Sequence, residues 1–401
     1  MIDLLVIGAG PYGLSVAREA MRAGLSTTVL GRPMSFWREH MPAGMYLRSG
    51  PDWHLDPASE LTYREFAAEV PDPIPVASFL EYADWFTASA GIEVRDEEVV
   101  SLEPGFVARL AGGGTVSARF VVAAPGVSRF GVIPEWGAGL GRHTCDLVDF
   151  ASMEGARVLI VGGRQSAYEW AALIGEAGAE RVDVVHRHPE PRFARVSWAF
   201  IEPHIESTLS TPGWWRNLPA ADRDAIGRRF WEVGRLTLEP WLTPRLARLP
   251  VHRHANAEVI AVDGRDAARS RGAAPGRDAA RGGDAARPCD APGHDAAPGR
   301  DAARSRDAAA PVRVTLSTGI NLHADRVVFA CGYRPDIARV PYLPRISTSD
   351  GFPDLDPAFG TSVPGLYIPG FPATRDFGPF FGFVRGAVPA ARMIVRDMMR
   401  A

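Results

Sequence analysis

The stretch Leu4-Leu5-Val6-Ile7-Gly8-Ala9-Gly10-Pro11-Tyr12-Gly13 decides the fold of this chain. Its four apolar residues are typical of a strand that is buried on both faces of a parallel sheet. The run leads directly into the spacing G-x-G-x-x-G, and apolar residues then recur at helical spacing until Gly24. Residues 27–30, Thr-Thr-Val-Leu, are typical of a second strand. The stretch therefore predicts a complete βαβ unit at the start of the chain.

The glycines of this unit predict a dinucleotide-binding turn. Gly8 allows the tight turn after the strand, Gly10 lets the backbone approach a pyrophosphate, and Gly13 lets the helix pack on the strand. The N-terminus of the helix that follows the turn points unpaired amides and a partial positive charge at the phosphates.

Residues 31–56 follow this turn and are candidates for walls of the same site. An acid often closes the second strand of such units and holds the ribose, but Gly31 stands in that place. We therefore expect Arg32 or the backbone to hold the ribose. The loop 41–56 is rich in aromatic and polar groups, and two interpretations stay open: a wall of the site, or an ordinary surface connection.

Composition limits the class of protein. The chain has 401 residues, 46% of them hydrophobic, and a formal net charge of -3, which predicts a soluble protein of two domains without general affinity for nucleic acid or membranes. No apolar run is long enough to cross a bilayer, and no basic segment precedes the first strand, so we expect a cytoplasmic protein without a signal peptide. Cys145, Cys289 and Cys331 form no C-x-x-C pair, so neither a dithiol centre nor a metal site is expected.

A second βαβ pattern begins at Arg157. The apolar run 158–161 leads into Gly162-Gly163-Arg164-Gln165-Ser166-Ala167, which opens a helix, and residues 182–185 form the next strand. Two copies of the pattern are more specific than either alone. Because Arg164 replaces the middle glycine, either nucleotide binding is weakened or Arg164 itself meets the pyrophosphate.

A basic run, His186-Arg187-His188, follows the last strand of this second pattern. A cation at that position suits a 2′-phosphate and favours NADPH over NADH. The alternative is a solvated basic turn.

The rest of the chain contains one helical region, one biased segment and further strands. Residues 192–249 are predicted to be largely helical, with Phe230, Val233, Leu236 and Leu238 on one helix face. The five tryptophans of this region are more typical of a hydrophobic core than of a substrate-binding pocket. Residues 264–310 repeat Asp, Ala, Arg and Gly and bury too little apolar surface to order, so we predict a disordered insertion in a hairpin of strands 259–262 and 312–316. Two more apolar strands are predicted to end near Gly126 and Gly332. Gly378-Pro379 opens a helical turn that either brings amides against a ring or only starts a helix.

With both glycine turns and the segment Ala330-Cys331-Gly332-Tyr333-Arg334-Pro335 in view, the chain resembles the two-dinucleotide-binding-domain flavoproteins. It looks most like their single-component NAD(P)H-dependent monooxygenases: lysine and ornithine N-hydroxylases, Baeyer–Villiger enzymes and bacterial urate-hydroxylase-like proteins. The resemblance covers nearly the whole chain apart from the biased segment. It implies an α/β fold of two Rossmann-like domains, with the NAD(P)-binding domain inserted in the FAD-binding domain. The predicted ranges are 1–150 for the first part of the FAD domain, 151–262 for the NAD(P) domain with its Trp-rich helices, 263–311 for the insertion, and 312–401 for the return strands and the end of the FAD domain.

The resemblance also implies two cofactor sites. The residues expected to contact FAD are Gly8, Gly10, Pro11, Gly13, Arg32, Trp37, Gly126, Gly378 and Pro379. The residues expected to contact NADPH, or NADH, are Gly162, Gly163, Arg164, Gln165, Ser166 and Arg187, with Gly332 in the strand that joins the domains. Residues 34–37, 41–45 and 377–382 carry the likeness to urate hydroxylases.

The Baeyer–Villiger signature is only partly present. Gly139 and His143 fit it, but Gly137 and Leu147 stand where aromatic residues belong. This departure argues against the ketone-oxidising subclass.

The leading hypothesis for function is a flavin monooxygenase acting on a small organic substrate. In such enzymes NADPH reduces FAD, reduced flavin reacts with molecular oxygen, and a flavin C4a-(hydro)peroxide transfers one oxygen atom. From their loop position, Arg48 and His54 are the candidates for catalytic groups near the flavin or nicotinamide. Two alternatives stay open: an NAD(P)H-dependent flavin dehydrogenase or reductase without oxygen insertion, and a flavin- or nucleotide-binding protein without turnover.

Overall fold

The structure is a computed structural model that describes residues 1–146, 149–263, 287–288 and 311–401. The predicted insertion, 263–311, lies outside these residues except at its edges and at 287–288, and Leu147 and Cys289 also lie outside them. Within the described part of the chain, no helix has the length and apolarity needed to cross a membrane.

The chain divides into two compact units. The first contains Met1–Phe130, Ser197–Gly234 and Pro335–Ala401, and the second contains Gly131–Val196 and Arg235–Arg334. Each unit has its own parallel sheet, and the second interrupts the sequence of the first. The predicted α/β fold, with one nucleotide-binding domain inserted in the other, is confirmed.

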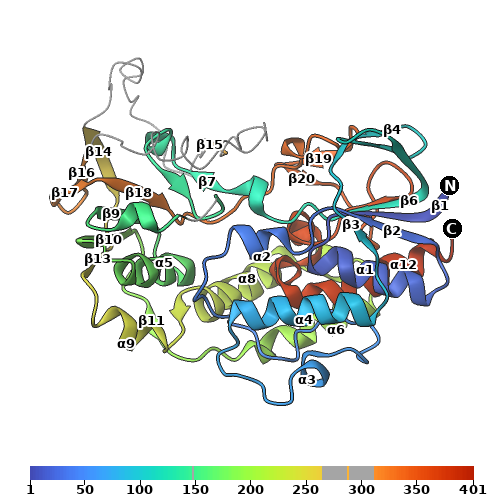
Figure 1. The fold of residues 1–401 in the computed structure, drawn as a ribbon, viewed down its shortest axis with the longest axis horizontal. Coiled ribbons are helices and arrows are strands. Elements are labelled where there is room, and N and C mark those ends of the chain that lie inside the picture. Colours follow the sequence, from blue (N-terminus) through green and yellow to red (C-terminus); the bar gives the residue numbers. More distant parts are fainter. Residues whose placement is uncertain (147–148, 264–286, 289–310) are drawn as a thin grey trace. The chain divides into compact units, whose positions relative to one another are not determined.

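The first unit is built on a mostly parallel sheet in the order β3-β2-β1-β6-β5-β4, with β21 beside β6 (Figure 1). Strands β4 and β5 are antiparallel to their neighbours, and the other pairings are parallel. The strands are β1 (Ile2–Ile7), β2 (Thr27–Leu30), β3 (Val94–Arg95), β4 (Val99–Glu103), β5 (Val107–Leu110), β6 (Thr115–Ala123) and β21 (Leu366–Tyr367). Leu4, Leu5 and Val6 of β1 are fully buried, because β1 is central in the sheet and helices cover it.

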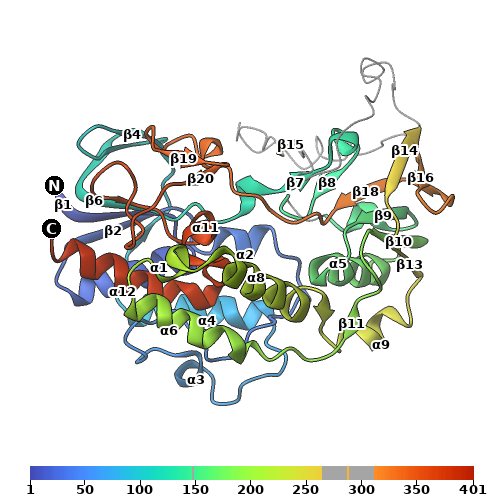
Figure 2. The same ribbon diagram turned by 180° about the vertical axis from the view of Figure 1, so that it is seen from behind.

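Helices of the first unit come from both ends of its sequence. Helix α1 (Pro11–Arg22) joins β1 to β2 and packs against α12 (Ala387–Met398), near the end of the chain (Figure 2). The other helices are α2 (Ser35–Glu39), α3 (Tyr63–Phe66), α4 (Val76–Ser89), α6 (Glu202–Ser210), α7 (Trp214–Asn217), α8 (Ala220–Gly234) and α11 (Thr374–Phe377). Helix α12 buries one face against the unit, which contains Ala390, Ala391, Ile394, Val395 and Met398.

The second unit contains an all-parallel sheet in the order β13-β10-β9-β18-β8. Its strands are β8 (Arg142–His143), β9 (Arg157–Val161), β10 (Arg181–His186), β13 (Val251–Ala255) and β18 (Arg326–Phe329). Helix α5 (Gln165–Glu176) joins β9 to β10, as the second βαβ pattern predicts, and α9 (Leu242–Leu246) packs beside it.

An antiparallel sheet completes the second unit. Strand β14 (Val259–Asp263) pairs with β16 (Val312–Leu316), which pairs with β17 (Asn321–Ala324). This pairing confirms the predicted hairpin. The remaining short strands pair two by two: β7 (Val132–Ile133) with β15 (Arg287–Pro288), β11 (Arg192–Phe193) with β12 (Thr237–Leu238), and β19 (Thr348–Ser349) with β20 (Phe352–Pro353).

The Trp-rich region belongs to both units and departs from the predicted pattern. Residues 197–234 group with the first unit, where Trp198 packs against Phe230 and Phe383. The predicted helix face through residues 236 and 238 is wrong, because α8 ends at Gly234 and Leu238 lies in β12. The boundaries of the second unit also differ from the predicted 151–262, since β8 and β18 pair within its sheet.

Candidate functional site

The glycine turn of the first unit is shaped by contacts between backbone segments. Gly8 has φ +111°, and a Cβ on it would lie 2.3 Å from the carbonyl oxygen of Ala124 at the end of β6. A Cβ on Gly13 would lie 1.8 Å from the Gly8 oxygen. Both positions therefore require glycine for the packing of strand, turn and helix, as the fingerprint predicts.

Gly10 differs, because no atom lies within 4 Å of the place a Cβ would take. It begins α1 with extended backbone and no side-chain cap, and Pro11 follows in the first helical position. The first amides of a helix have no acceptor within the helix, and they carry a partial positive charge. The open space at Gly10 and this uncapped helix start fit a pyrophosphate, the group that a dinucleotide places there.

Tyr12 links this turn to the C-terminal segment. Its hydroxyl donates to the carbonyl oxygen of Phe383 at 2.9 Å and to that of Phe381. A Cβ on Gly386 would lie 2.4 Å from the same hydroxyl. Burial raises the pKa of the Tyr12 phenol well above its usual value, so it remains a donor.

The hydrogen bonds of Tyr12 hold the segment that contains Gly378 and Pro379. These residues open a short 3-10 helix, Pro379–Gly382, and not the final helix, which begins at Ala387. Gly378 has φ +94°. Gly126, the remaining glycine expected at this site, has φ +70° and follows β6 in an exposed turn.

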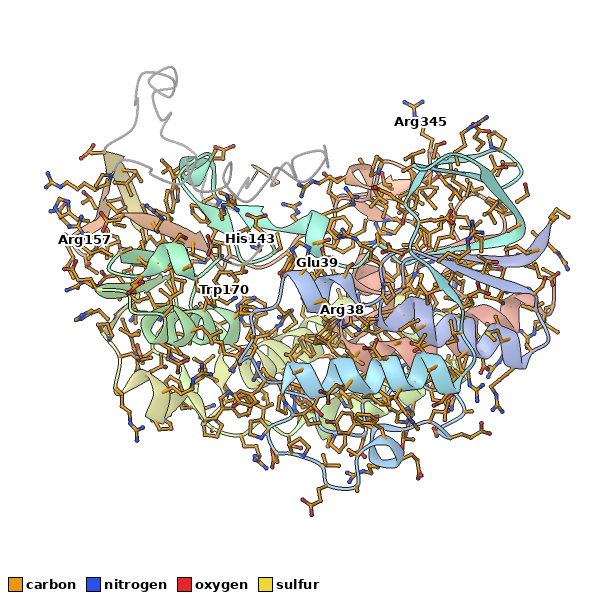
Figure 3. The ribbon with its side chains drawn as sticks, in the orientation of Figure 1. Arg38, Glu39, His143, Arg157, Trp170 and Arg345 are labelled. Atoms are coloured by element: carbon orange, nitrogen blue, oxygen red, sulfur yellow. The ribbon has the colours of Figure 1, made fainter. Side chains whose placement is uncertain are left out.

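Residues 31–39 form the next wall of the first turn. Gly31 has φ +127°, and a Cβ there would lie 3.5 Å from the Ala9 amide nitrogen, so no acidic side chain fits this position without strain. Arg32 forms an ion pair at 2.8 Å with Glu39 of α2, whose place Figure 3 labels. Trp37 packs against Phe79, with ring centroids 4.9 Å apart.

Arg48 is held by three contacts within the first unit. Its Nη1 donates to the carbonyl oxygen of Gly234 at 2.7 Å, and its own carbonyl accepts from Trp198 Nε1 at 3.1 Å. Its guanidinium carbon lies 5.5 Å from the centre of the Trp198 ring. Arg48 therefore joins the loop 41–56 to the segment 197–234.

His54 lines a polar pocket on the same loop, beside Trp53, which packs on Trp198 at 5.7 Å. Burial lowers the pKa of His54; Asp56 and Asp52 oppose that shift, and Arg385 and Arg392 add to it.

The turn of the second unit repeats the geometry of the first. Gly162 has φ +137°, and a Cβ on it would lie 2.4 Å from the Ala330 carbonyl oxygen, as Gly8 meets Ala124. Arg164 begins α5 with φ -106° and ψ -173°, close to the -90° and -172° of Gly10. Arg164 therefore occupies the position of the middle glycine. Gly163 is required for a different reason, since a Cβ on it would lie 2.3 Å from the His186 ring.

Three arginines approach one another at the beginning of α5. Burial lowers the pKa of Arg164 to about 9, and the charges of Arg235 and Arg187 act in the same direction. Repulsion of this kind is relieved by an anion. Arg187 is exposed, whereas His186 is buried and lies 2.9 Å from the Tyr168 hydroxyl. Of the predicted basic run, Arg187 is thus the exposed cation whose charge acts on Arg164 at the beginning of α5.

Gln165 and Ser166 occupy the first turn of α5. Ser166 is exposed, and Gln165 is buried with its Oε1 accepting from the Glu239 amide at 3.0 Å. The Gln165 Nε2 is buried without a hydrogen-bond partner within the described residues. A ligand oxygen at this helix end would satisfy it.

Gly332 lies beside the same turn, with Arg164 Nη1 4.0 Å from the place of a Cβ. His143, labelled in Figure 3, holds the Gly332 segment, since its Nε2 lies 3.0 Å from the Gly332 oxygen. The Cys145 amide donates to His143 Nδ1 at 3.0 Å, so Nε2 carries the ring proton. His143 is therefore a buried structural residue.

The residues expected at the two cofactor sites thus fall into two groups, one in each unit. Sequence reasoning missed Tyr12 and Arg235. Tyr12 lies inside the fingerprint, but its partners are more than 360 positions away, and no local pattern marks such a contact. Arg235 directly follows residues 197–234, which belong to the first unit. Its approach to Arg164 therefore depends on the return of the chain to the second unit at residue 235.

Comparison with known proteins identifies the family. Residues 5–212 match the pyridine nucleotide-disulphide oxidoreductase family. The chain belongs to this family. The resemblance to two-domain flavoproteins is thereby confirmed, and the predicted cofactors, FAD with NADPH or NADH, agree with it.

Curated relatives include an oxygenating enzyme and reductases. The chain is 32% identical over 174 residues to FAD-dependent urate hydroxylase of Xanthomonas campestris, covering 40% of this chain and 35% of that protein. It is 31% identical over 208 residues to a ferredoxin--NADP reductase of Ralstonia nicotianae, covering 49% of this chain and 54% of that protein. The chain therefore spans between a third and a little over half of the length of these relatives.

Among solved structures, ornithine N-hydroxylase of Kutzneria sp. 744 superposes with a TM-score of 0.73 at 17% identity, covering 100% of this chain and 99% of that chain. This likeness supports the fold alone.

Proposed function

We propose that the protein is an FAD-dependent monooxygenase that uses NADPH to hydroxylate a small organic substrate. The observation that carries the proposal is the pair of glycine turns with matching backbone geometry, one starting with open space at Gly10 and the other with Arg164 beside Arg187 and Arg235. The first suits a tightly held dinucleotide, and the second suits a dinucleotide with an additional phosphate. Oxygen insertion is supported by the urate hydroxylase among the relatives and by the sequence, which has no C-x-x-C pair for disulfide reduction.

FAD, when bound, supplies acceptance of a hydride and activation of oxygen. The overall reaction is NADPH + H⁺ + O₂ + substrate → NADP⁺ + H₂O + hydroxylated substrate, so the nicotinamide loses two electrons and oxygen is divided between product and water. The residues of the chain itself would bind the two cofactors and orient them. The amides of the α1 start and Gly10 would hold the pyrophosphate, and Tyr12 would fix the segment 378–383 beside it.

In the second unit, Gln165, Ser166 and Gly163 would hold the NADPH pyrophosphate at the start of α5, and Arg187 its 2′-phosphate. Arg48 is fixed by Gly234 and Trp198, and it stays our candidate for a catalytic group near the flavin or nicotinamide.

A second candidate function is a flavin reductase that passes electrons to another acceptor. The ferredoxin--NADP reductase among the relatives favours it. The two functions differ in where the electrons of NADPH go. A protein that binds nucleotides without turnover is the third possibility.

An oxygen-18 experiment separates these functions. The purified yellow protein is mixed with NADPH and ¹⁸O₂, using urate, indole-3-pyruvate and L-ornithine as probes. We expect one of them to raise the rate of NADPH oxidation and to gain one labelled oxygen atom per NADPH consumed. Electrons recovered only as hydrogen peroxide or as reduced ferredoxin, with no label in any product, would favour the reductase. A colourless protein that does not take up FAD would contradict both.

A further inference from the structure

A polar pocket lies in the first unit between residues 52–59 and the beginning of α12. Its volume is about 160 Å³, well above the space that a single water molecule needs. Asp52, His54 and Ser59 line it from the loop, and Arg385 and Arg392 line it from the helix side. Trp53 and Val388 contribute an apolar part of the wall.

The carboxylates around this pocket already have cationic partners. Arg385 binds Glu202 with Nε 2.9 Å from Oε1, and Arg64 Nε lies 3.0 Å from Asp52. Arg392 donates instead to the backbone carbonyl of Pro57, with its Nε at 3.1 Å. No carboxylate among the described residues forms an ion pair with Arg392. The pocket wall therefore carries one positive charge without a matching negative charge.

The imidazole of His54 adds a second unsatisfied group. Its Nδ1 is buried and has no hydrogen-bond partner in the part of the chain that the structure describes. A buried polar nitrogen of this kind is costly unless it is hydrogen-bonded. The two arginines and the burial of the ring keep its pKa below the ordinary value, although Asp52 and Asp56 act against them. An anion in the pocket would reverse the effect of the arginines and favour the protonated form of the ring that lines the pocket.

We propose that this pocket is a binding site for a small oxyanion, a phosphate or carboxylate group, held by Arg392, Arg385 and His54. The guanidinium groups donate charge-assisted hydrogen bonds to the oxygens, and the Ser59 hydroxyl lies at the rim. None of the wall residues of this pocket belongs to the glycine turn, residues 8–13. The anion is either free phosphate or the carboxylate of a larger ligand whose apolar part packs against Trp53 and Val388.

Equilibrium titration of the FAD-loaded protein tests this site without turnover. Potassium phosphate, sodium acetate and sodium benzoate are titrated at constant ionic strength by calorimetry. We expect saturable binding, and a loss of affinity on the order of tenfold in Arg392→Gln. Tighter binding of phosphate than of benzoate indicates the free ion, and the reverse order indicates a carboxylate carried by a planar ligand.

Two variants control the titration. Arg396→Gln removes an exposed arginine one turn further along α12 and should bind as the unmodified protein does. His54→Phe keeps an aromatic ring, removes both ring nitrogens and should weaken binding even if Arg392→Gln fails to fold after losing its contact with Pro57. The proposal is overturned if none of the three anions binds saturably, or if Arg396→Gln weakens binding as much as the pocket variants do.

Discussion

Gly10 begins α1 where a side chain would meet open space, whereas Gly8 and Gly13 touch other backbone atoms. A substitution at Gly10 should therefore leave the fold intact and affect the ligand alone. We expect Gly10→Val to purify as a folded protein without FAD, because the isopropyl group occupies the place of the pyrophosphate. The absorption spectrum and the thermal unfolding of the apoprotein measure the two effects. Gly227→Ala, also in open space but on α8, is the control; a fully yellow Gly10→Val would contradict the site.

Arg187 is the exposed member of the arginine group at the start of α5. A charge-assisted hydrogen bond contributes about 1.5–3 kcal/mol, so its loss changes affinity on the order of tenfold or more. We expect Arg187→Ala to raise the KM for NADPH by that factor and to leave the KM for NADH nearly unchanged, since NADH has no 2′-phosphate. Steady-state kinetics with both nucleotides measures the ratio. Arg192→Ala, at another exposed arginine of the second unit, should change neither value. Equal effects of Arg187→Ala on both nucleotides would remove the phosphate contact.

His143 makes the stability of the second unit depend on pH. Burial lowers its pKa from 6.5 to about 4. Between these values the unfolded chain binds a proton that the folded chain excludes, so stability falls as the pH decreases from 6.5 toward 4. The expected loss between pH 7 and pH 5 is about 2 kcal/mol.

Urea unfolding at the two pH values measures this loss. In His143→Gln the difference between pH 7 and pH 5 should become smaller, because the titrating group is gone, although stability at pH 7 also decreases with the contact to Gly332. His252→Gln, at an exposed histidine of β13, should retain the full difference. An unchanged difference in His143→Gln would show that other groups cause the pH dependence.

At the scale of elements, helices α1 and α12 connect the start of the chain to its last segment. Tyr12 adds two hydrogen bonds between the first turn of α1 and the carbonyls that precede α12. Tyr12→Phe should destabilise the protein by about 1–3 kcal/mol, since it leaves buried acceptors without a donor. It should also speed the release of FAD, because the segment 378–383 loses its contact with the glycine turn.

Tyr63→Phe provides the matched control for this element. The Tyr63 hydroxyl lies 2.6 Å from Ser78 Oγ and joins α3 to α4, away from the glycine turn. We expect Tyr63→Phe to lower the unfolding temperature without changing the rate of FAD release. Release is followed by flavin fluorescence after dilution. Equal release rates in both variants would mean that Tyr12 has only a structural role.

At the scale of the whole molecule, the elements with strong local patterns could be predicted from the sequence. The two βαβ patterns and the hairpin of β14 and β16 follow from apolar periodicity and glycine positions. The assignment of residues 197–234 to the first unit could not be predicted, because it depends on the packing of Trp198 with residues that are distant in the sequence. The group of Arg164, Arg187 and Arg235 could not be predicted for the same reason, since Arg235 and Arg164 come together only in the folded second unit.

The register of β14 and β16 gives a prediction for the chain as a whole. Asp263 pairs with Arg313, so the two strands end side by side and a short turn can join them. We expect a variant in which Gly-Asn-Gly-Ser replaces residues 264–311, which leaves a five-residue loop between Asp263 and Arg313, to fold, to retain FAD and to oxidise NADPH at the original rate. Its unfolding temperature should stay the same or rise, since each halving of loop length recovers about 0.6 kcal/mol of closure entropy. Differential scanning calorimetry and cofactor content measure both. A variant that is insoluble or has lost NADPH oxidation would show that residues 264–311 serve the fold or the site, and the hairpin alone would not be sufficient.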